Sequence, residues 1–231
     1  MPSTFAAIAR EFLFPAGCAV CGMPLLAGHE CLSGVCEDCA KILVPEAGLR
    51  CPRCGRPLVS EHNLCAECRD RPEPSYDSAR ALFRYGRTAR ALMVAYKFGT
   101  GRAAAGFIAE RIRGELDFVG GEAVVVPVPP RFGKIKRVGW DQIELIAARL
   151  EHSGVRVSRC LRRLPSRSQK ELDRSGRATN LVGKIACVST PPRRAILLDD
   201  VITTGATLDA CARSLKAAGS EKVYALAFCY D

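Results

Sequence analysis

The chain has 231 residues, of which 48% are hydrophobic, and it carries a formal net charge of +10. This length suits one ordinary domain with a small additional module, and no apolar run is long enough to cross a membrane, so we expect no membrane partner. The charge is uneven: residues 1–75 carry 7 Lys and Arg against 9 Asp and Glu, whereas residues 76–231 carry 27 against 15.

The N-terminal stretch has apolar residues at roughly helical spacing: Phe5, Ile8, Phe12 and Leu13. Arg10 and Glu11 interrupt it, so the stretch lacks the basic-then-apolar order of a signal peptide. We therefore expect a short helix packed on the protein, in a soluble, cytoplasmic chain.

Nine of the 13 cysteines lie between Cys18 and Cys68, and eight of them form four C-x-x-C knuckles. In a chain without an export signal such pairs indicate metal rather than disulfides, because the tight turn aims both sulfurs at one ion. Pairing consecutive knuckles predicts two structural Zn²⁺ sites, with an interleaved arrangement as the alternative. The predicted ligands are Cys18, Cys21, Cys36 and Cys39 for one ion, and Cys51, Cys54, Cys65 and Cys68 for the other. Cys31 is left over as a spare thiol.

This cysteine-rich segment is too short and too poor in large apolar residues to fold on a core alone. Zinc binding, on the order of 10 kcal/mol per site, supplies the missing stability. The negative formal balance of the segment argues against a phosphate-binding face and favours a structural or docking module. The Pro-rich stretch at residues 69–75 is the natural boundary. We thus expect an N-terminal helix with a double zinc ribbon over residues 1–72, and a larger domain over residues 76–231.

The larger domain alternates strand-like and helix-like stretches. We expect strands at residues 79–85, 123–128, 155–161, 185–188, 194–198 and 223–229. We expect helices at residues 87–98, 103–118, 140–150, 172–180 and 208–218. Such alternation predicts an α/β fold with a parallel sheet.

Two stretches of this domain are well arranged to receive a polyphosphate. The strand at residues 123–128 runs into a rigid turn, Pro129 and Pro130, followed by Arg131 and Lys134. Arg162 and Arg163 open a second basic loop, which we expect to close over a ligand. The excess charge is concentrated here, since residues 131–177 hold 13 basic and 5 acidic side chains. A solvated basic surface is the alternative interpretation.

The most informative stretch is an apolar strand that ends in Asp199 and Asp200, followed by a Thr-rich loop at residues 203–207 and a helix. The amides and dipole at a helix start attract a phosphate, and Gly205 lets the backbone approach a ligand closely. Two adjacent carboxylates repel a phosphate placed on them, so they suit sugar hydroxyls or a hydrated Mg²⁺ instead. A capped helix after a core strand is the simpler interpretation of each feature taken alone.

The ordered combination D-D-V-I-T-T-G-A-T resembles the phosphoribosyl pyrophosphate (PRPP) motif of type I phosphoribosyltransferases. This resemblance implies that the acidic pair holds the ribose hydroxyls and the Thr-rich loop holds the 5′-phosphate. The implied PRPP-binding residues are Asp199, Asp200, Val201, Thr203, Thr204, Gly205, Ala206 and Thr207. If the protein is catalytic, Mg²⁺ and a second group of residues neutralise the departing pyrophosphate. That second group is Pro129, Pro130, Arg131, Lys134, Arg162 and Arg163.

The chain as a whole resembles the ComF family, competence-associated proteins that join a double zinc ribbon to a phosphoribosyltransferase domain. The resemblance is carried by the four knuckles, by residues 96–99, 126–129, 139–142 and 199–207, and by Gln169, Leu172, Arg177 and Asn180. It implies a role in the uptake and handling of single-stranded DNA, with a competence protein as a partner for the ribbon. One departure lies at residues 138–142, Val-Gly-Trp-Asp-Gln, where many members carry Arg-Gly-Phe-Asn-Gln. That difference argues against a direct phosphate role for this turn.

Two functions remain open. The first is a phosphoribosyltransferase, a glycosyltransferase whose acceptor the sequence does not identify. The second is a non-catalytic module that binds PRPP, a nucleotide or a 5′-phosphorylated DNA end. We assign no catalytic residue, because His29, His62 and His152 lie away from these motifs. A zinc-ribbon transcription factor is disfavoured because the ribbon is not basic.

Overall fold

A computed structural model of the chain describes residues 16–25, 28–45, 48–58, 63–98, 102–131, 139–164 and 184–231. Three sequence predictions fall outside these ranges: the helix near residues 5–13, the helix at 172–180, and the position of Lys134. Within the described ranges, no helix combines the length and the hydropathy needed to cross a bilayer.

The larger part of the molecule is built on a four-stranded sheet, which confirms the predicted α/β class. Its strands are β1 (Ser78–Arg84), β2 (Val124–Pro127), β5 (Arg194–Ile202) and β6 (Lys222–Tyr230), in the order β1-β6-β5-β2. All three strand pairs are parallel, so the carboxyl ends of the strands meet at one edge. The architecture is consistent with a phosphoribosyltransferase-like fold.

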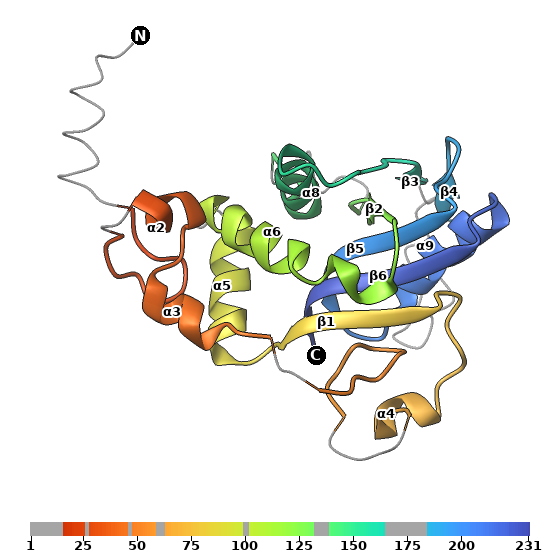
Figure 1. The fold of residues 1–231 in the computed structure, drawn as a ribbon, viewed down its shortest axis with the longest axis horizontal. Helices are drawn as coiled ribbons and strands as arrows, with labels where there is room; N and C mark the ends of the chain where they lie inside the picture. Colours follow the sequence, from red (N-terminus) through yellow and green to blue (C-terminus); the bar gives the residue numbers. More distant parts are fainter. Residues whose placement is uncertain are drawn as a thin grey trace, which may run out of the picture.

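Helices cover both faces of this sheet (Figure 1). On one face lie α5 (Arg87–Phe98), α6 (Ala105–Arg113) and α8 (Gln142–His152), and on the other lies α9 (Ala206–Ala217). Strand β5 serves both layers, because side chains alternate along a strand. Ile196 and Leu198 belong to the core under α5, α6 and α8, whereas Ala195 and Leu197 belong to the core under α9. The apolar runs of the parallel strands are therefore explained by burial on two sides.

The structure corrects several of the expected elements. The helix expected at residues 103–118 is divided into η1 (Arg102–Ala104), α6 and η2 (Leu116–Val119), because α6 ends at Gly114, a residue that disfavours helix. The strand expected at 155–161 is wrong: Val157 forms an isolated bridge with Val125 of β2, and Leu161 is the only other residue of this range that pairs in a sheet. Strand β2 has only four residues and leaves little edge to pair with. The chain instead forms β3 (Leu161–Arg163), which pairs antiparallel with β4 (Ile185–Cys187) in a separate small sheet.

The two cysteine-rich units lie apart from one another (Figure 1). The first contains α2 (Gly28–Ser33) and α3 (Glu37–Ile42) and lies beside α5 and α6. The second contains α4 (Ala66–Arg69) and lies along β1. We call them ribbon 1, residues 16–45, and ribbon 2, residues 48–69. The domain boundary at residues 69–75 stays a prediction.

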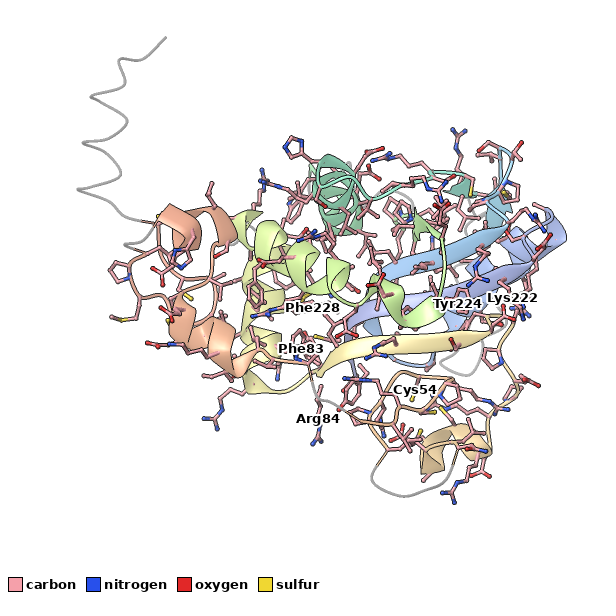
Figure 2. All side chains as sticks on the ribbon, in the orientation of Figure 1. Cys54, Phe83, Arg84, Lys222, Tyr224 and Phe228 are labelled. Atoms are coloured by element: carbon pink, nitrogen blue, oxygen red, sulfur yellow. The ribbon has the colours of Figure 1, made fainter. Side chains whose placement is uncertain are left out.

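Ribbon 2 covers the open side of β1, the outermost strand of the sheet. The Ala79 amide donates to the Pro52 carbonyl at 2.6 Å, and the Arg50 guanidinium donates to the Ala81 carbonyl at 2.6 Å. Figure 2 shows Cys54 beside this strand. An uncovered edge strand is a template for pairing with other chains, so ribbon 2 protects the sheet from aggregation.

Candidate functional site

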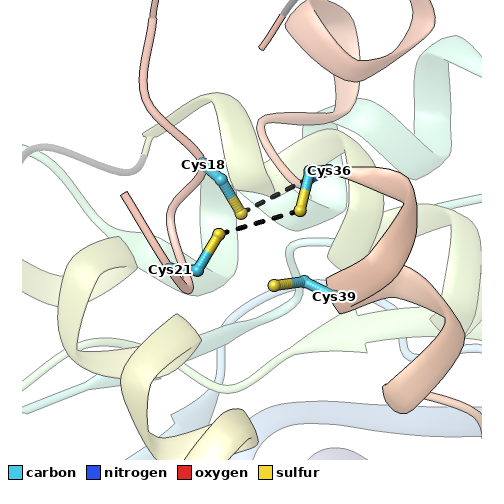
Figure 3. Close-up of side chains that lie close together, drawn as sticks. All are labelled: Cys18, Cys21, Cys36 and Cys39. Carbon is cyan, nitrogen blue, oxygen red and sulfur yellow. Dashed lines mark hydrogen bonds between the residues drawn. The ribbon is translucent and has the colours of Figure 1, made fainter. Parts of the chain in front are cut away.

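The four sulfurs of each consecutive knuckle pair converge on one point, as Figure 3 shows for ribbon 1. Cys18, Cys21, Cys36 and Cys39 form one cluster, and Cys51, Cys54, Cys65 and Cys68 form the other. Within each cluster the ligand atoms all lie within 4.8 Å of one another. Four thiolates at this spacing are a closed tetrahedral donor set, which fits structural Zn²⁺. The consecutive pairing is confirmed and the interleaved alternative is excluded.

The same turn builds the first knuckle of each ribbon. The amide of Gly22 donates to the Cys18 carbonyl at 2.9 Å, and the amide of Gly55 donates to the Cys51 carbonyl at 2.8 Å. Both glycines have positive φ, 77° and 73°, which an L side chain adopts only with strain. The glycine after each C-x-x-C pair therefore lets the chain turn back beneath the metal site.

Backbone amides prepare one sulfur of each cluster for a metal. Burial opposes ionisation of Cys18, but N–H groups of its cluster outweigh it and lower its pKa to about 7. The same balance lowers the pKa of Cys51 to about 7. Burial raises the pKa of Cys39 and raises that of Cys68 to about 12. The backbone amides therefore favour the thiolate form of Cys18 and Cys51, and a Zn²⁺ bound by each cluster would supply further positive charge that favours thiolate ligands.

Cys31 lies outside both clusters. Its thiol is exposed and donates to the Leu25 carbonyl at 3.5 Å, in agreement with its assignment as a spare thiol.

The acidic pair lies inside a strand rather than beyond its end, which corrects the expected end of the strand at Leu198. Strand β6 continues past this point, and Asp199 is in register with its Ala227, so β5 extends to Ile202. On the other side β2 ends at Pro127, in register with Leu198. The two carboxylates therefore lie where β5 has a neighbour on one side only.

Lys97 contacts this acidic pair, and sequence reasoning missed it. Its Nζ lies 2.6 Å from Oδ2 of Asp200, and both side chains are largely buried. Lys97 belongs to the last turn of α5. Residues 96–99 are part of the family resemblance and could have indicated that Lys97 has a functional role. The sequence pattern alone does not predict that Lys97 lies beside Asp200.

The Gly-Trp-Asp-Gln turn at residues 139–142 supports the helix end that carries Lys97. The Tyr96 hydroxyl donates to the backbone carbonyl of Gln142 at 2.6 Å, and the side-chain Nε2 of Gln142 donates to the Lys97 carbonyl at 3.4 Å. Trp140 packs edge-on against Tyr96, with ring centroids 5.3 Å apart. Asp141 accepts from the Glu144 amide at 2.8 Å and caps α8. The turn therefore positions α5 and α8.

The Thr-rich loop leads directly into α9. Gly205 is the N-cap residue of this 12-residue helix, with φ of 75°. The Thr204 hydroxyl accepts from the Ala206 amide at 3.4 Å, and both Thr203 and Thr204 are exposed. The first amides of a helix have no partner within the helix, so the loop offers donors where the helix dipole is positive.

The basic residues separate into two groups. Arg163 is half-buried and interacts electrostatically with Cys211, Arg131 and Asp199, while burial lowers its pKa. Arg162, its neighbour in β3, is exposed. Arg163 is therefore within electrostatic range of Asp199 and of Arg131. Pro129 is buried and Pro130 is half-buried in the turn that precedes Arg131. Lys134 lies outside the described residues.

Comparisons with known proteins agree with this organisation. Residues 9–69 match the double zinc ribbon domain. Competence protein ComFC of Streptococcus pneumoniae is 26% identical over 197 residues, covering 83% of this chain and 85% of that protein. Competence protein F of Haemophilus influenzae is 26% identical over 208 residues, covering 84% and 90% respectively.

A third relative has been named for DNA utilization rather than competence. DNA utilization protein YhgH of Escherichia coli is 24% identical over 226 residues, covering 93% of this chain and 97% of that protein. The similarity to each of these proteins extends over most of the chain. Together with the two four-cysteine clusters and the parallel sheet, these similarities support the resemblance of the chain to the ComF family.

Proposed function

We propose that this protein binds PRPP at the carboxyl edge of its sheet and acts as a phosphoribosyltransferase in the handling of incoming DNA. The observation that carries the proposal is the ion pair of Lys97 with Asp200, in the part of β5 that contains both Asp199 and Asp200 and that leads through the Thr-rich loop into the glycine-started helix α9. In parallel α/β sheets this edge is where ligands bind.

The 5′-phosphate is assigned to the loop at residues 203–207. Thr203 and Thr204 are exposed there, and the backbone at Gly205 carries no side chain that would keep a ligand away. A phosphate at this place is attracted by the first amides of α9 and by its dipole. The loop follows the acidic pair in the sequence, so a phosphate bound at the loop does not occupy the carboxylates, which can bind the sugar.

The ribose hydroxyls are assigned to Asp199 and Asp200. The Oδ1 atom of Asp199 accepts from the amide of Asp200 at 2.8 Å, and Oδ2 of Asp200 is held by Lys97. These contacts fix both carboxylates before a ligand arrives, which reduces the ordering that binding requires. Hydroxyl donors of a ribose suit such acceptors because no negative charge has to approach them.

Arg131 and Arg163 are assigned to the pyrophosphate, which enters as its Mg²⁺ complex. When an acceptor attacks C1′, the bond from C1′ to the pyrophosphate oxygen breaks and that oxygen keeps the electron pair. Guanidinium groups next to the leaving oxygens stabilise this charge. No residue is assigned as a general base, and the acceptor is left open.

The cellular role follows from the relatives. They are named for competence and for DNA utilization, and they match this chain over most of its length. We therefore place the activity in the uptake or use of DNA, with single-stranded DNA and a protein of the competence machinery as candidate partners. Ribbon 1 is the candidate surface for that protein, because Met23, Leu32 and Ile42 are exposed on it.

Calorimetry on zinc-loaded protein with PRPP and Mg²⁺ tests the binding step. We expect one site, and we expect Asp199→Asn combined with Asp200→Asn to weaken binding at least tenfold. Release of pyrophosphate across a panel of nucleobases and amines tests the transfer step. Absence of heat with PRPP and with ribose 5-phosphate would remove the proposal.

A non-catalytic module is the second candidate, and one observation favours it: residues 131–177 hold 13 basic and 5 acidic side chains. Such a stretch fits a DNA backbone as well as a pyrophosphate. Salt-sensitive binding of 5′-phosphorylated single-stranded DNA, with no pyrophosphate release from PRPP, would favour the module over the enzyme.

A further inference from the structure

The loop assigned to the 5′-phosphate is in contact with Tyr76, a residue outside every motif discussed above. Tyr76 is only 5% exposed, and a Cβ built on Gly205 would lie 3.0 Å from its hydroxyl oxygen. That hydroxyl donates to the Arg53 carbonyl at 2.5 Å. Arg53 lies between the metal ligands Cys51 and Cys54, so one side chain joins the turn of ribbon 2 to the start of α9.

The residue before Tyr76 makes a second contact with the same helix. The amide of Ser75 donates to Oδ1 of Asp209 at 2.7 Å, and Asp209 lies in the first turn of α9. The amide of Asp209 in turn donates to the Gly205 carbonyl at 2.8 Å. Residues 75 and 76 therefore hold both the N-cap and the first turn of the helix.

A second series of contacts joins ribbon 2 to the Thr-rich loop through Asp231. The Arg56 guanidinium donates to the Asp231 carbonyl at 3.2 Å and lies over the Tyr230 ring, 5.6 Å from its centroid. The Asp231 amide donates to the carbonyl of Ile202, the residue directly before the Thr-rich loop, at 3.0 Å. Ribbon 2 thus holds the loop at its beginning, through Ile202, and at the N-cap of α9, through Gly205.

We propose that ribbon 2 is a positioning device for the phosphate loop, with Tyr76 as the positioning residue that transmits the fixed geometry of the zinc knuckle to Gly205. The knuckle is a suitable anchor because a four-thiolate zinc site is rigid, and Arg53 is enclosed between two of its ligands. Donors that are held in place before binding lose less freedom when a phosphate arrives. This inference rests on the proposed function, because it assumes that residues 203–207 receive a phosphate.

The test compares two single-atom deletions in the full-length, zinc-loaded protein. Tyr76→Phe removes the hydroxyl that joins Arg53 to the loop. Tyr224→Phe is the matched control, because it also removes a tyrosine hydroxyl that has a hydrogen-bond partner. The Tyr224 hydroxyl accepts from the Arg194 guanidinium at 3.3 Å. Tyr224 lies near the start of β6, whereas Phe228 lies near its end (Figure 2). Affinity for ribose 5-phosphate is measured by calorimetry, zinc content by metal analysis, and protection of the amides of residues 203–209 by hydrogen exchange.

We expect Tyr76→Phe to weaken ribose 5-phosphate binding about three- to tenfold, the usual effect of losing one hydrogen bond. The number of sites per protein and the zinc content stay unchanged, and the amides of residues 203–209 exchange faster. Tyr224→Phe leaves affinity and exchange at these residues unchanged. A purely structural role for Tyr76 would lower thermal stability while the folded molecules kept full affinity.

Two negative results are distinguishable. If wild-type protein binds ribose 5-phosphate and both variants bind equally well, the positioning role is wrong and the proposed function stands. If the wild-type protein itself binds neither ribose 5-phosphate nor PRPP, the proposed function fails, and the inference fails with it. Arg56→Gln tests the second series of contacts independently, and we expect it to accelerate exchange at the Thr-rich loop without loss of zinc.

Discussion

The two ribbons share one sequence pattern but are integrated into the molecule in different ways. Ribbon 1 contributes Leu25, Val35 and Leu43 to the apolar core that lies under α5, α6 and α8. Ribbon 2 contributes little apolar surface; it covers the edge of β1 through backbone contacts, and its Cys54 packs against the core under α9. Ribbon 1 therefore extends the core on one face of the sheet, whereas ribbon 2 covers the edge of the sheet at β1.

This difference shows that identical metal chemistry can serve two structural purposes. Ribbon 1 is an extension of a hydrophobic core, so its exposed residues are free to form a docking surface. Ribbon 2 closes a sheet edge and contacts the loop assigned to the phosphate. We expect perturbation of ribbon 1 to affect stability and partner binding, and perturbation of ribbon 2 to affect the sheet and the ligand site.

Loss of one metal site is the largest effect we expect. Cys51→Ser with Cys54→Ser removes the ribbon 2 zinc, a contribution on the order of 10 kcal/mol to the folding of that unit. We expect zinc content to fall from two ions to one, the β1 edge to open, and ribose 5-phosphate binding to be lost. Metal analysis, light scattering and calorimetry measure these three effects.

Cys18→Ser with Cys21→Ser is the matched change in ribbon 1. We expect the same loss of one zinc ion, with at most a severalfold change in ligand affinity. Equal loss of ligand binding in both double variants would contradict the division of roles between the ribbons.

The glycines after the first knuckles give a sharper comparison. A Cβ at Gly55 would lie 2.3 Å from the Ala81 amide nitrogen, whereas a Cβ at Gly22 would meet nothing within 4 Å. Both have positive φ, so alanine costs about 1 kcal/mol of strain at either place. At Gly55 it also forces ribbon 2 away from β1. We expect Gly55→Ala to lower the free energy of unfolding by about 3 kcal/mol and Gly22→Ala by about 1 kcal/mol, measured by urea denaturation. Equal losses would show that ribbon 2 is not seated against β1 as described.

The ion pair of Lys97 with Asp200, at the proposed ligand site, is half-buried and can be compared with an ion pair on the exposed surface. Lys97→Met removes the cation that faces Asp200 and leaves the site one charge more negative. PRPP is a polyanion, so we expect its affinity to fall about tenfold, measured by calorimetry. Lys41→Met is the control in ribbon 1, because Lys41 pairs with Glu37 at 2.8 Å on the exposed surface of α3. We expect Lys41→Met to leave the affinity for PRPP unchanged. If Lys97→Met also left this affinity unchanged, Lys97 would not be part of the PRPP site.

The smallest effect concerns Asp77, where the chain that leaves ribbon 2 enters the sheet. Burial opposes ionisation of Asp77, but the Val223 amide and the ammonium groups of Lys216 and Lys222 outweigh it and lower its pKa. A lowered pKa in the folded state means that the stabilisation is complete above the ordinary pKa of aspartate and is lost as the pH falls through the folded value. We expect Asp77→Asn to cost about 1 kcal/mol near neutral pH and nothing in strong acid, measured by denaturation at a series of pH values.

Glu37→Gln in ribbon 1 is the control for this prediction. Glu37 also has a lowered pKa, because of Lys41, but it is fully exposed. We expect no measurable pH-dependent change in stability there. If the difference in the free energy of unfolding between Asp77→Asn and wild type did not change with pH over this range, the contacts of ionised Asp77 would not stabilise the fold.

Several features of this fold could be predicted because they depend on local spacing. The knuckles specify their own turns, and the helix at Arg87–Phe98 was predicted with the observed bounds, since its apolar spacing is regular throughout. The strand at residues 155–161 was wrong because strand pairing depends on a neighbour, and β2 offers too short an edge. The end of β5 was misplaced for the same reason, since β6 extends alongside Asp199.

By itself, the sequence determined the eight zinc ligands, the α/β class and the stretch from Asp199 to Thr207 as the leading candidate for a ligand site. Only the tertiary structure decided which knuckles share a metal, that Lys97 faces Asp200, and that Tyr76 joins Arg53 to Gly205. The physical reason is distance along the chain. A turn or a helix is specified by neighbouring residues, whereas contacts between residues 97 and 200, or 53, 76 and 205, exist only after the sheet has brought remote segments together.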